Sequence, residues 1–257
     1  MLQMKNNVPD EKEVRWLLEE KYAGIVSSAY EEDLGRLEQG EPLAYLIGNV
    51  PFLGAHIDLE FRTLIPRTET EFWVQRVLEK MPHVTTGETV RCLDIFSGSG
   101  CIGIAVLTHR AEYVVDFADY DPRAIAQIKK NISLNHIDES RCRVFQSDIF
   151  ADIPEGRYDY IFANPPYIPS TRRESLDTSV VAHEPHEALF SGIDGLDCIR
   201  RLLSDLASYL SPTGTLYLEF DCDQKESIEQ LCIEQHLACD CYKDQSDRWR
   251  YAEIRLT

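Results

Sequence analysis

The run Leu93-Asp94-Ile95-Phe96-Ser97-Gly98-Ser99-Gly100-Cys101-Ile102-Gly103-Ile104-Ala105-Val106 decides the fold of this chain. Apolar residues come first, a turn of serines and glycines follows, and a second apolar segment begins with small residues. This order is typical of a buried strand, a tight loop and a helix. Glycines let the backbone approach a ligand closely, and the start of a helix presents free N–H groups. The run therefore predicts a strand–loop–helix unit with a ligand site at its loop.

Two more apolar segments follow, and each leads into polar residues. The segment Tyr113–Ala118 ends in Asp119, and an acid at the end of the second strand of such a sheet can accept both hydroxyls of a ribose. The segment Arg141–Gln146 leads to Asp148 and Ile149. We expect Asp148 to receive an adenine amino group while its apolar neighbours cover the ring.

A fourth apolar segment, Tyr158–Ala163, leads directly into Asn164-Pro165-Pro166-Tyr167. Two prolines end the strand and fix the backbone that follows. An asparagine side chain offers one acceptor and two donors, so it can bind another planar amide or an amino group. The tetrapeptide indicates a clamp for a planar substrate nitrogen. An ordinary turn after a strand is the alternative, because Asn-Pro commonly starts turns.

The remaining pattern alternates strands and helices up to Thr257, which predicts an α/β fold with a doubly wound, mostly parallel seven-stranded sheet. In such a sheet, ligands bind outside the carboxyl ends of the strands, where all four features fall. The last two strands, 238–243 and 249–255, are close in sequence and predict an antiparallel hairpin at the edge. A helix is expected over Thr68–Lys80, with Thr68 as N-cap and Glu71 completing a capping box.

The front of the chain predicts a small appendage. Residues 1–47 are expected to form a short helical region, and residues 48–66 a β-hairpin connector. Residues 67–257 are expected to form the main α/β domain.

The chain resembles the release factor glutamine methyltransferases, a family of class I S-adenosylmethionine-dependent methyltransferases with a Rossmann-like fold. Besides the glycine loop and Asn164–Tyr167, the resemblance rests on these segments: Gly40–Gly48, Leu64–Glu71, Glu184-Pro185 followed by Ala188-Leu189, Gly192–Leu196, and the ending Arg248–Leu256. Asn-Pro-Pro-Tyr alone is shared with adenine-N6 DNA methyltransferases. The Leu64–Glu71 segment together with Glu184-Pro185 is much more specific.

The resemblance implies that the chain methylates the glutamine side-chain amide in the Gly-Gly-Gln loop of peptide chain release factors, its partners, with S-adenosyl-L-methionine as cofactor and no metal. The residues expected to take part fall into three groups. The catalytic residues are Asn164, Pro165 and Tyr167; those that bind the cofactor are Phe96, Ser97, Gly98, Ser99, Gly100, Asp119, Asp148, Ile149 and Asn164; those that bind the substrate are Asn164, Pro165, Pro166, Tyr167 and Glu184.

Three departures from the family pattern stand out. Phe96 occupies a position where the family usually has glycine, and we expect it either to crowd or to line the cofactor pocket. Thr68 occupies a position that is usually proline. The resemblance implies that residues 1–47 recognise the substrate and that residues 67–257 are the methyltransferase catalytic domain. The segment before Gly40 looks shorter than the family's helical domain, which bears on docking of the substrate rather than on catalysis.

The composition of the chain limits the classes of molecule that it is expected to bind. The net charge is −18 over 257 residues, whereas a protein that binds a free duplex normally needs a basic face. The eight cysteines lack paired C-x-x-C spacing, which predicts reduced, mostly buried thiols rather than a zinc site. No apolar stretch is long enough to span a bilayer and no secretory signal is visible, so we expect a cytoplasmic protein that binds neither membrane nor, directly, nucleic acid.

Three alternatives stay open at this point. The same clamp suits the amino group of an adenine in nucleic acid, which would require a contiguous basic surface. A sister family methylates glutamine in a ribosomal protein. A cofactor-binding scaffold without activity would be a third possibility. In the segment 169–195, which predicts a lid, His183 and His186 are expected at the surface rather than in catalysis, and Glu184 either anchors the lid or accepts from the substrate backbone.

Overall fold

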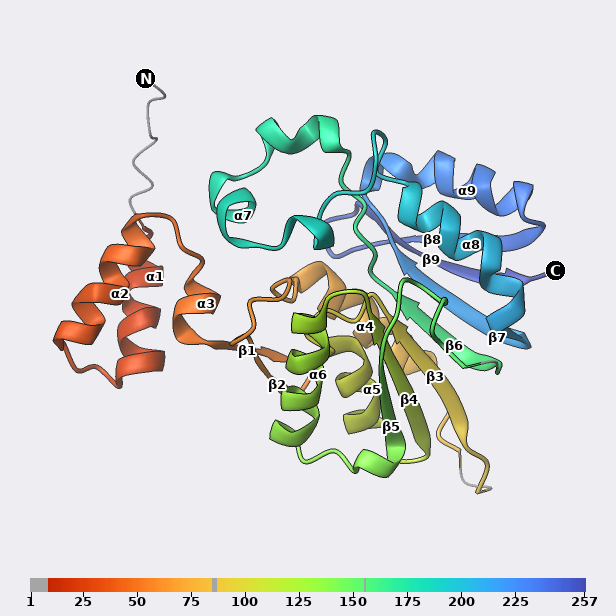
Figure 1. Cartoon of the computed structure of the whole chain (residues 1–257), viewed down its shortest axis with the longest axis horizontal. Coiled ribbons are helices and arrows are strands. Elements are labelled where there is room, and N and C mark those ends of the chain that lie inside the picture. The colour runs from red at the N-terminus through yellow and green to blue at the C-terminus, as the bar shows by residue number, and fades with distance from the viewer. Residues whose placement is uncertain (1–8, 85–86, 155) are drawn as a thin grey trace.

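The computed structural model describes residues 9–84, 87–154 and 156–257. Its centre is a seven-stranded sheet with helices on both faces, which confirms the predicted fold class (Figure 1). The order of strands across the sheet is β5-β4-β3-β6-β7-β9-β8. In chain order the strands are β3 (Val90–Ile95), β4 (Tyr113–Asp119), β5 (Cys142–Gln146), β6 (Tyr158–Ala163), β7 (Leu210–Glu219), β8 (Leu237–Lys243) and β9 (Trp249–Leu256).

Neighbouring strands from β5 to β7 are parallel, whereas β9 runs antiparallel to both β7 and β8. The predicted edge hairpin is therefore confirmed. Parallel strands covered on both faces have near-continuous apolar sequences, and this property made them visible in the sequence.

Two layers of helices enclose two separate apolar cores. Helices α4 (Thr68–Lys80), α5 (Cys101–His109) and α6 (Pro122–Leu134) share a core with one face of the sheet. Helices α8 (Asp197–Tyr209) and α9 (Lys225–Glu234) share a core with the other face. Successive residues of a strand point to opposite faces, so Cys92 belongs to the first core and Leu93 to the second.

The chain before the sheet folds as a small helical unit and a hairpin, as predicted. The unit consists of α1 (Glu11–Trp16), a π-helical turn (Leu17–Lys21), α2 (Ser28–Glu38) and α3 (Leu43–Ile47). It has its own apolar cluster around Leu17, Tyr30, Leu37 and Leu46. Strands β1 (Asn49–Phe52) and β2 (Ala55–Asp58) pair antiparallel. Asn131 of α6 and Asn135, the C-cap of α6, accept hydrogen bonds from backbone N–H groups of β2.

The predicted capping box of α4 is wrong, because the N-cap residue makes no side-chain capping hydrogen bond. The N-cap is Arg67, and Thr68 is already helical and donates its hydroxyl proton to Glu69. Glu71 instead accepts from the backbone N–H of Leu53 at 2.9 Å, which ties the helix to the hairpin. A tertiary contact has replaced the local one.

Two further expectations concern the cysteines and membranes. All eight cysteines are free, but only Cys92, Cys101 and Cys232 are buried, so the expectation of mostly buried thiols is wrong. Within the described residues, no helix has both the length and the apolar character required to traverse a bilayer.

Candidate functional site

The register of the sheet brings the carboxyl ends of three neighbouring strands together. Ile95 at the end of β3 pairs with Ala118 of β4 on one side and with Ala163 of β6 on the other. The next residues along these strands, Phe96, Asp119 and Asn164, consequently lie at neighbouring strand ends. The chain winds outward from β3 to β5 and then returns to β6, so β3 and β6 flank the switch point of the sheet, where open α/β sheets bind ligands.

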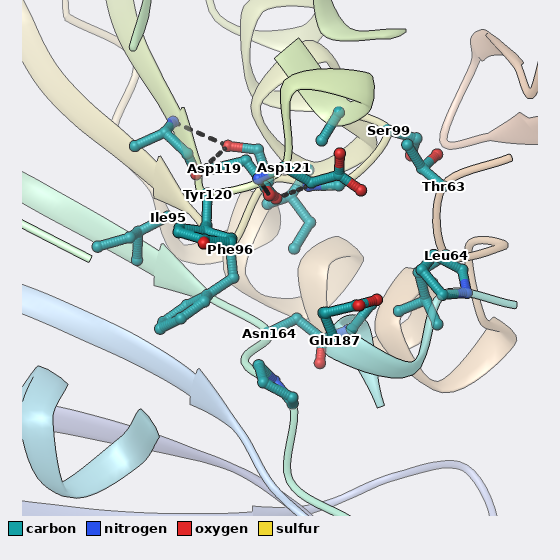
Figure 2. Close-up of a pocket in the computed structure, with 18 of the residues that line it drawn as sticks. Thr63, Leu64, Ile95, Phe96, Ser99, Asp119, Tyr120, Asp121, Asn164 and Glu187 are labelled. Carbon is teal, nitrogen blue, oxygen red and sulfur yellow. Dashed lines mark hydrogen bonds between the residues drawn. The ribbon is translucent and has the colours of Figure 1, made fainter. Parts of the chain in front are cut away.

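A cavity of about 360 Å³ opens at this point (Figure 2). Its walls come from the glycine loop, the ends of β4 to β6, the segment before α4 and the lid. The lining residues that matter below are Thr63, Arg67, Thr70, Phe96, Ser97, Gly98, Ser99, Asp119, Tyr120, Asp121, Asp148, Ile149, Asn164, Pro166 and Glu187. Of the predicted site residues, Gly100, Pro165, Tyr167 and Glu184 lie outside this lining.

The glycine loop has the conformation that its sequence requires. Gly98 has φ +55°, and no atom lies within 4 Å of the place where a Cβ would stand, so the backbone is open toward the cavity. Gly100 has φ +79° and is the N-cap of α5. At Gly103, a Cβ would meet the ring of Phe117 at 2.3 Å, and this glycine therefore permits close packing of α5 on the sheet.

Asp119 links the loop to the second strand. One carboxylate oxygen accepts from the N–H of Gly98 at 2.8 Å and the other from the N–H of Asp121 at 2.9 Å. Each oxygen retains a further lone pair for a ligand hydroxyl. Burial raises the pKa of Asp119, although the backbone N–H groups oppose this shift. The arrangement suits a pair of ribose hydroxyls.

Phe96 lines the cavity, which is one of its two expected roles, with φ +60°. A left-handed backbone favours glycine and is uncommon for a bulky residue. The side chain also packs against the apolar core on the α8 side, which offsets part of this strain.

The third strand end provides Asp148 and Ile149, both in the lining. Ile149 is buried and apolar, in line with a role in covering a ring. The Oδ2 atom of Asp148 lies 2.8 Å from Arg201 in an exposed ion pair. Any ligand amino group at Asp148 therefore shares the carboxylate with this arginine.

Asn164 lies at the end of β6 and lines the cavity. Its Nδ2 donates to the hydroxyl of Thr70 on α4 at 3.3 Å. Its Oδ1 accepts no hydrogen bond from the described residues. The free acceptor is the group that a clamp for an N–H donor requires.

The residues after Asn164 are fixed by the interior of the protein. Pro166 lines the cavity, whereas the Tyr167 hydroxyl donates to the buried carboxylate of Glu219 at 3.1 Å. The Tyr167 carbonyl accepts from Gln224 at 2.9 Å. These contacts favour a role for Tyr167 in holding the clamp rather than in touching a ligand.

The predicted lid contains three short helical turns rather than irregular chain alone: Ser170–Ser175, α7 (Thr178–His183) and His186–Ala188. Glu184 is buried and accepts from Arg67 at 2.6 Å and from the N–H of Ile65 at 3.3 Å. Of the two expectations for Glu184, these contacts favour the anchor of the lid. Neither His183 nor His186 lines the cavity, and the ring of His186 contacts the carbonyl of Val181.

Gly195, at the end of the lid, packs against the backbone of Tyr167 in the clamp, and this contact leads to a prediction about stability. A Cβ at this position, where φ is +81°, would lie 2.1 Å from the Tyr167 carbonyl oxygen. Gly195→Ala is expected to destabilise the protein by about 3 kcal/mol, from overpacking and left-handed strain together. Gly24→Ala is the matched control, because Gly24 has φ +80° with open space around it. Urea unfolding should separate the two variants, and equal losses would contradict a clash at Tyr167.

Sequence reasoning missed several residues of the site. Tyr120 and Asp121 line the cavity directly after Asp119, and Thr63 lines it from the segment before α4. Glu219 was missed as well, although an acid at the end of the apolar strand β7 was a signal in itself.

Among the described residues, the one cluster with suitable spacing for a metal is Asp221, Cys222 and Asp223, and Arg172 pairs with both of its carboxylates.

A nucleotide-sized cavity at the switch point of a sheet in this order, with an antiparallel β9, defines a class I S-adenosylmethionine-dependent methyltransferase. Residues 74–192 match the family model of the methyltransferase small domain. The ribosomal protein L11 methylase of Lactobacillus delbrueckii subsp. bulgaricus has a similar fold, with a TM-score of 0.55 and 20% identity over 78% of this chain and 84% of that one.

Similarity in sequence is more specific. A release factor glutamine methyltransferase of Geobacter sulfurreducens is 33% identical over 82% of this chain and 72% of its own length. One of Streptococcus pneumoniae is 35% identical over 79% of this chain and 69% of its own length. The chain belongs to the release factor glutamine methyltransferase family.

Proposed function

We propose that this chain transfers a methyl group from S-adenosylmethionine to the side-chain nitrogen of the glutamine in the Gly-Gly-Gln loop of a peptide chain release factor. One observation carries the proposal. The carboxamide of Asn164 lines the cavity beside the glycine loop and leaves its oxygen free for an N–H donor. The choice of substrate follows the relatives, which are release factor glutamine methyltransferases.

The cavity fits the cofactor. Open space at Gly98 gives room for a ligand close to the backbone, and Asp119 keeps a lone pair on each oxygen for the ribose hydroxyls. Ile149 would cover the adenine, with Asp148 at its amino group. Ser97, Ser99, Gly100 and Phe96 would complete the cofactor site. When bound, the cofactor supplies a methyl group on a sulfonium, which is electrophilic without further activation.

The protein must hold a poor nucleophile. The lone pair of an amide nitrogen is delocalised into its carbonyl, so positioning has to supply much of the rate enhancement. We propose that Asn164 Oδ1 and the Pro165 carbonyl accept the two protons of the substrate amide. Acceptors on these protons also stabilise positive charge that grows on the nitrogen. Pro166 would form part of the substrate site, and Tyr167 and Glu184 would hold the clamp and the lid in place.

No side chain is needed as a strong base in this proposal, because a methylated amide nitrogen is acidic and releases its proton to water. The histidines of the lid lie outside the cavity lining, which agrees with this view. Asn164, Pro165 and Tyr167 are accordingly proposed to act by binding and orientation.

Charge favours a protein substrate over nucleic acid. The short basic pairs are largely neutralised by neighbouring acids: Lys130 by Asp58 and Glu60, Arg172 by Asp221, Arg200 by Asp194 and Arg201 by Asp148. Phosphate binding would require these cations to be free. The compartment, for which we expect the cytoplasm, stays a prediction from the sequence.

The test is transfer of labelled methyl groups from S-adenosylmethionine to a release factor domain that carries Gly-Gly-Gln. We expect label on the wild-type domain and none on a control domain with Gln→Ala. Ribosomal proteins and an adenine-containing DNA duplex serve as parallel substrates. Label on either of them, with none on the release factor, would refute the proposal.

A further inference from the structure

A buried carboxylate lies behind the clamp, on the strand next to it. Glu219 is 1% exposed and follows Leu218, which pairs with Ala163 in the register of β7 and β6. Glu219 and Asn164 therefore occupy equivalent places at the ends of two adjacent strands. Both belong to the face of the sheet that α4 covers.

Helix α4 bridges these two residues through one hydroxyl. Thr70 Oγ1 donates to Glu219 Oε2 at 2.7 Å and lies 3.3 Å from Asn164 Nδ2. The indole N–H of Trp73, one turn further along α4, donates to the same oxygen of Glu219 at 2.6 Å. The other oxygen, Oε1, receives the Tyr167 hydroxyl at 3.1 Å. Two of these three donors come from α4, and the third belongs to the clamp tetrapeptide itself.

The direction of this chain of hydrogen bonds follows from counting protons. An indole nitrogen can only donate and an ionised carboxylate can only accept, so Oε2 of ionised Glu219 accepts from both Trp73 and Thr70. Thr70 has a single proton, which it gives to this acceptor, and its oxygen can then only accept from Asn164. The NH₂ group of Asn164 must therefore face Thr70, and its oxygen must face away. Burial raises the pKa of Glu219, while the hydrogen bonds from Trp73, Thr70 and Tyr167 oppose this shift by stabilising the ionised form, in which the direction holds.

We propose that Glu219, acting through Thr70, sets the orientation of the Asn164 carboxamide and thereby presents its oxygen to the substrate amide. This inference rests on the proposed function, because the orientation matters only for a substrate that donates N–H. Glu219 and Thr70 are positioning residues in this scheme. Without them, Asn164 can turn its NH₂ group to the substrate, and two donors then meet.

Thr70→Val is the most direct test, since it replaces the hydroxyl by a methyl group of similar size. We expect kcat for methylation of the Gly-Gly-Gln domain to fall about 10-fold, while the Kd for S-adenosylmethionine changes less than about 2-fold. Thr70→Ser keeps the hydroxyl and should restore most of kcat. Thr68→Val makes the same exchange at an exposed position of the same helix and serves as the matched control.

A double-mutant cycle tests whether Thr70 acts through Asn164. In an Asn164→Ala background, Thr70→Val should change kcat by less than about 2-fold, because there is no amide left to orient. Glu219→Gln is the second variant: Trp73 forces an acceptor at the Oε2 position, so the glutamine should keep the direction and most of kcat. Glu219→Leu removes the acceptor and should match Thr70→Val.

A measurement without substrate or cofactor separates this inference from the proposed function. In NMR spectra of the 15N-labelled protein, assigned with Asn164→Ala, the side-chain amide protons of Asn164 should exchange slowly in the wild type and in Thr70→Ser, and faster in Thr70→Val. If the exchange is slow and depends on Thr70 but the wild type transfers no methyl group, the inferred orientation of Asn164 stands and the proposed function is refuted. Three results would each overturn the inference. They are a normal kcat in Thr70→Val, an exchange rate of the Asn164 amide protons that does not depend on Thr70, and equal losses of kcat and cofactor affinity in Thr70→Val.

Discussion

Replacing Asn164 by alanine is expected to lower kcat for methylation of a release factor domain by about 100-fold or more. The loss of one preorganised hydrogen-bonding group beside a reacting atom typically costs this much. Cofactor binding should stay close to that of the wild type, because the ribose and adenine contacts proposed at Asp119, Asp148 and Ile149 come from other strands. Steady-state kinetics at saturating cofactor, together with titration calorimetry, separate the two effects.

Asn49→Ala provides the matched control for this prediction. Asn49 is half-buried at the start of β1, outside the cavity lining, and its replacement should leave kcat within about 2-fold of the wild-type value. Normal turnover by Asn164→Ala would rule out the clamp. A loss of cofactor affinity equal to the loss of kcat would instead make Asn164 a cofactor residue and leave the acceptor of the substrate protons unidentified.

The parts of the fold that the sequence predicted are those determined by local patterns. Apolar strands such as 158–163 are covered on both faces, and this makes them easy to recognise. The end of a strand is also a local feature, so the sequence alone was enough to place Asp119 and Asn164 at one edge of the sheet. The edge hairpin followed from the short separation of β8 and β9.

The parts that escaped prediction depend on contacts between distant segments. Glu71 matches a capping box in sequence but binds Leu53 of the hairpin, and Glu219 bonds to Thr70, 149 residues away along the chain. Tyr167 was predicted to contact the substrate, because the sequence could not show that its hydroxyl donates a hydrogen bond to the buried carboxylate of Glu219. The register of β6 and β7, which is set by side-chain packing across the sheet, brings that carboxylate to the clamp.

Asp119→Ala is expected to raise the Kd for S-adenosylmethionine about 100-fold and to leave kcat at saturating cofactor within a few-fold of the wild-type value. Two hydrogen bonds from ribose hydroxyls to a charged acceptor account for a loss of this size. The same change frees the N–H of Gly98, so the glycine loop loses its link to β4. Asp152→Ala is the control, because this exposed residue follows β5 outside the cavity lining.

The pH dependence of cofactor binding tests the same carboxylate without removing it. Burial raises the pKa of Asp119, so protonation should begin at a higher pH than for an exposed aspartate. Affinity should be complete above this raised pKa and should decrease as the pH falls through it, because the protonated form has lost an acceptor. Asp119→Asn should bind weakly at every pH, with a flat profile, since an amide does not titrate there. Unchanged affinity in Asp119→Ala, or the same acid limb in Asp119→Asn as in the wild type, would remove Asp119 from the ribose site. The next candidate would then be Asp121, another carboxylate of the cavity lining.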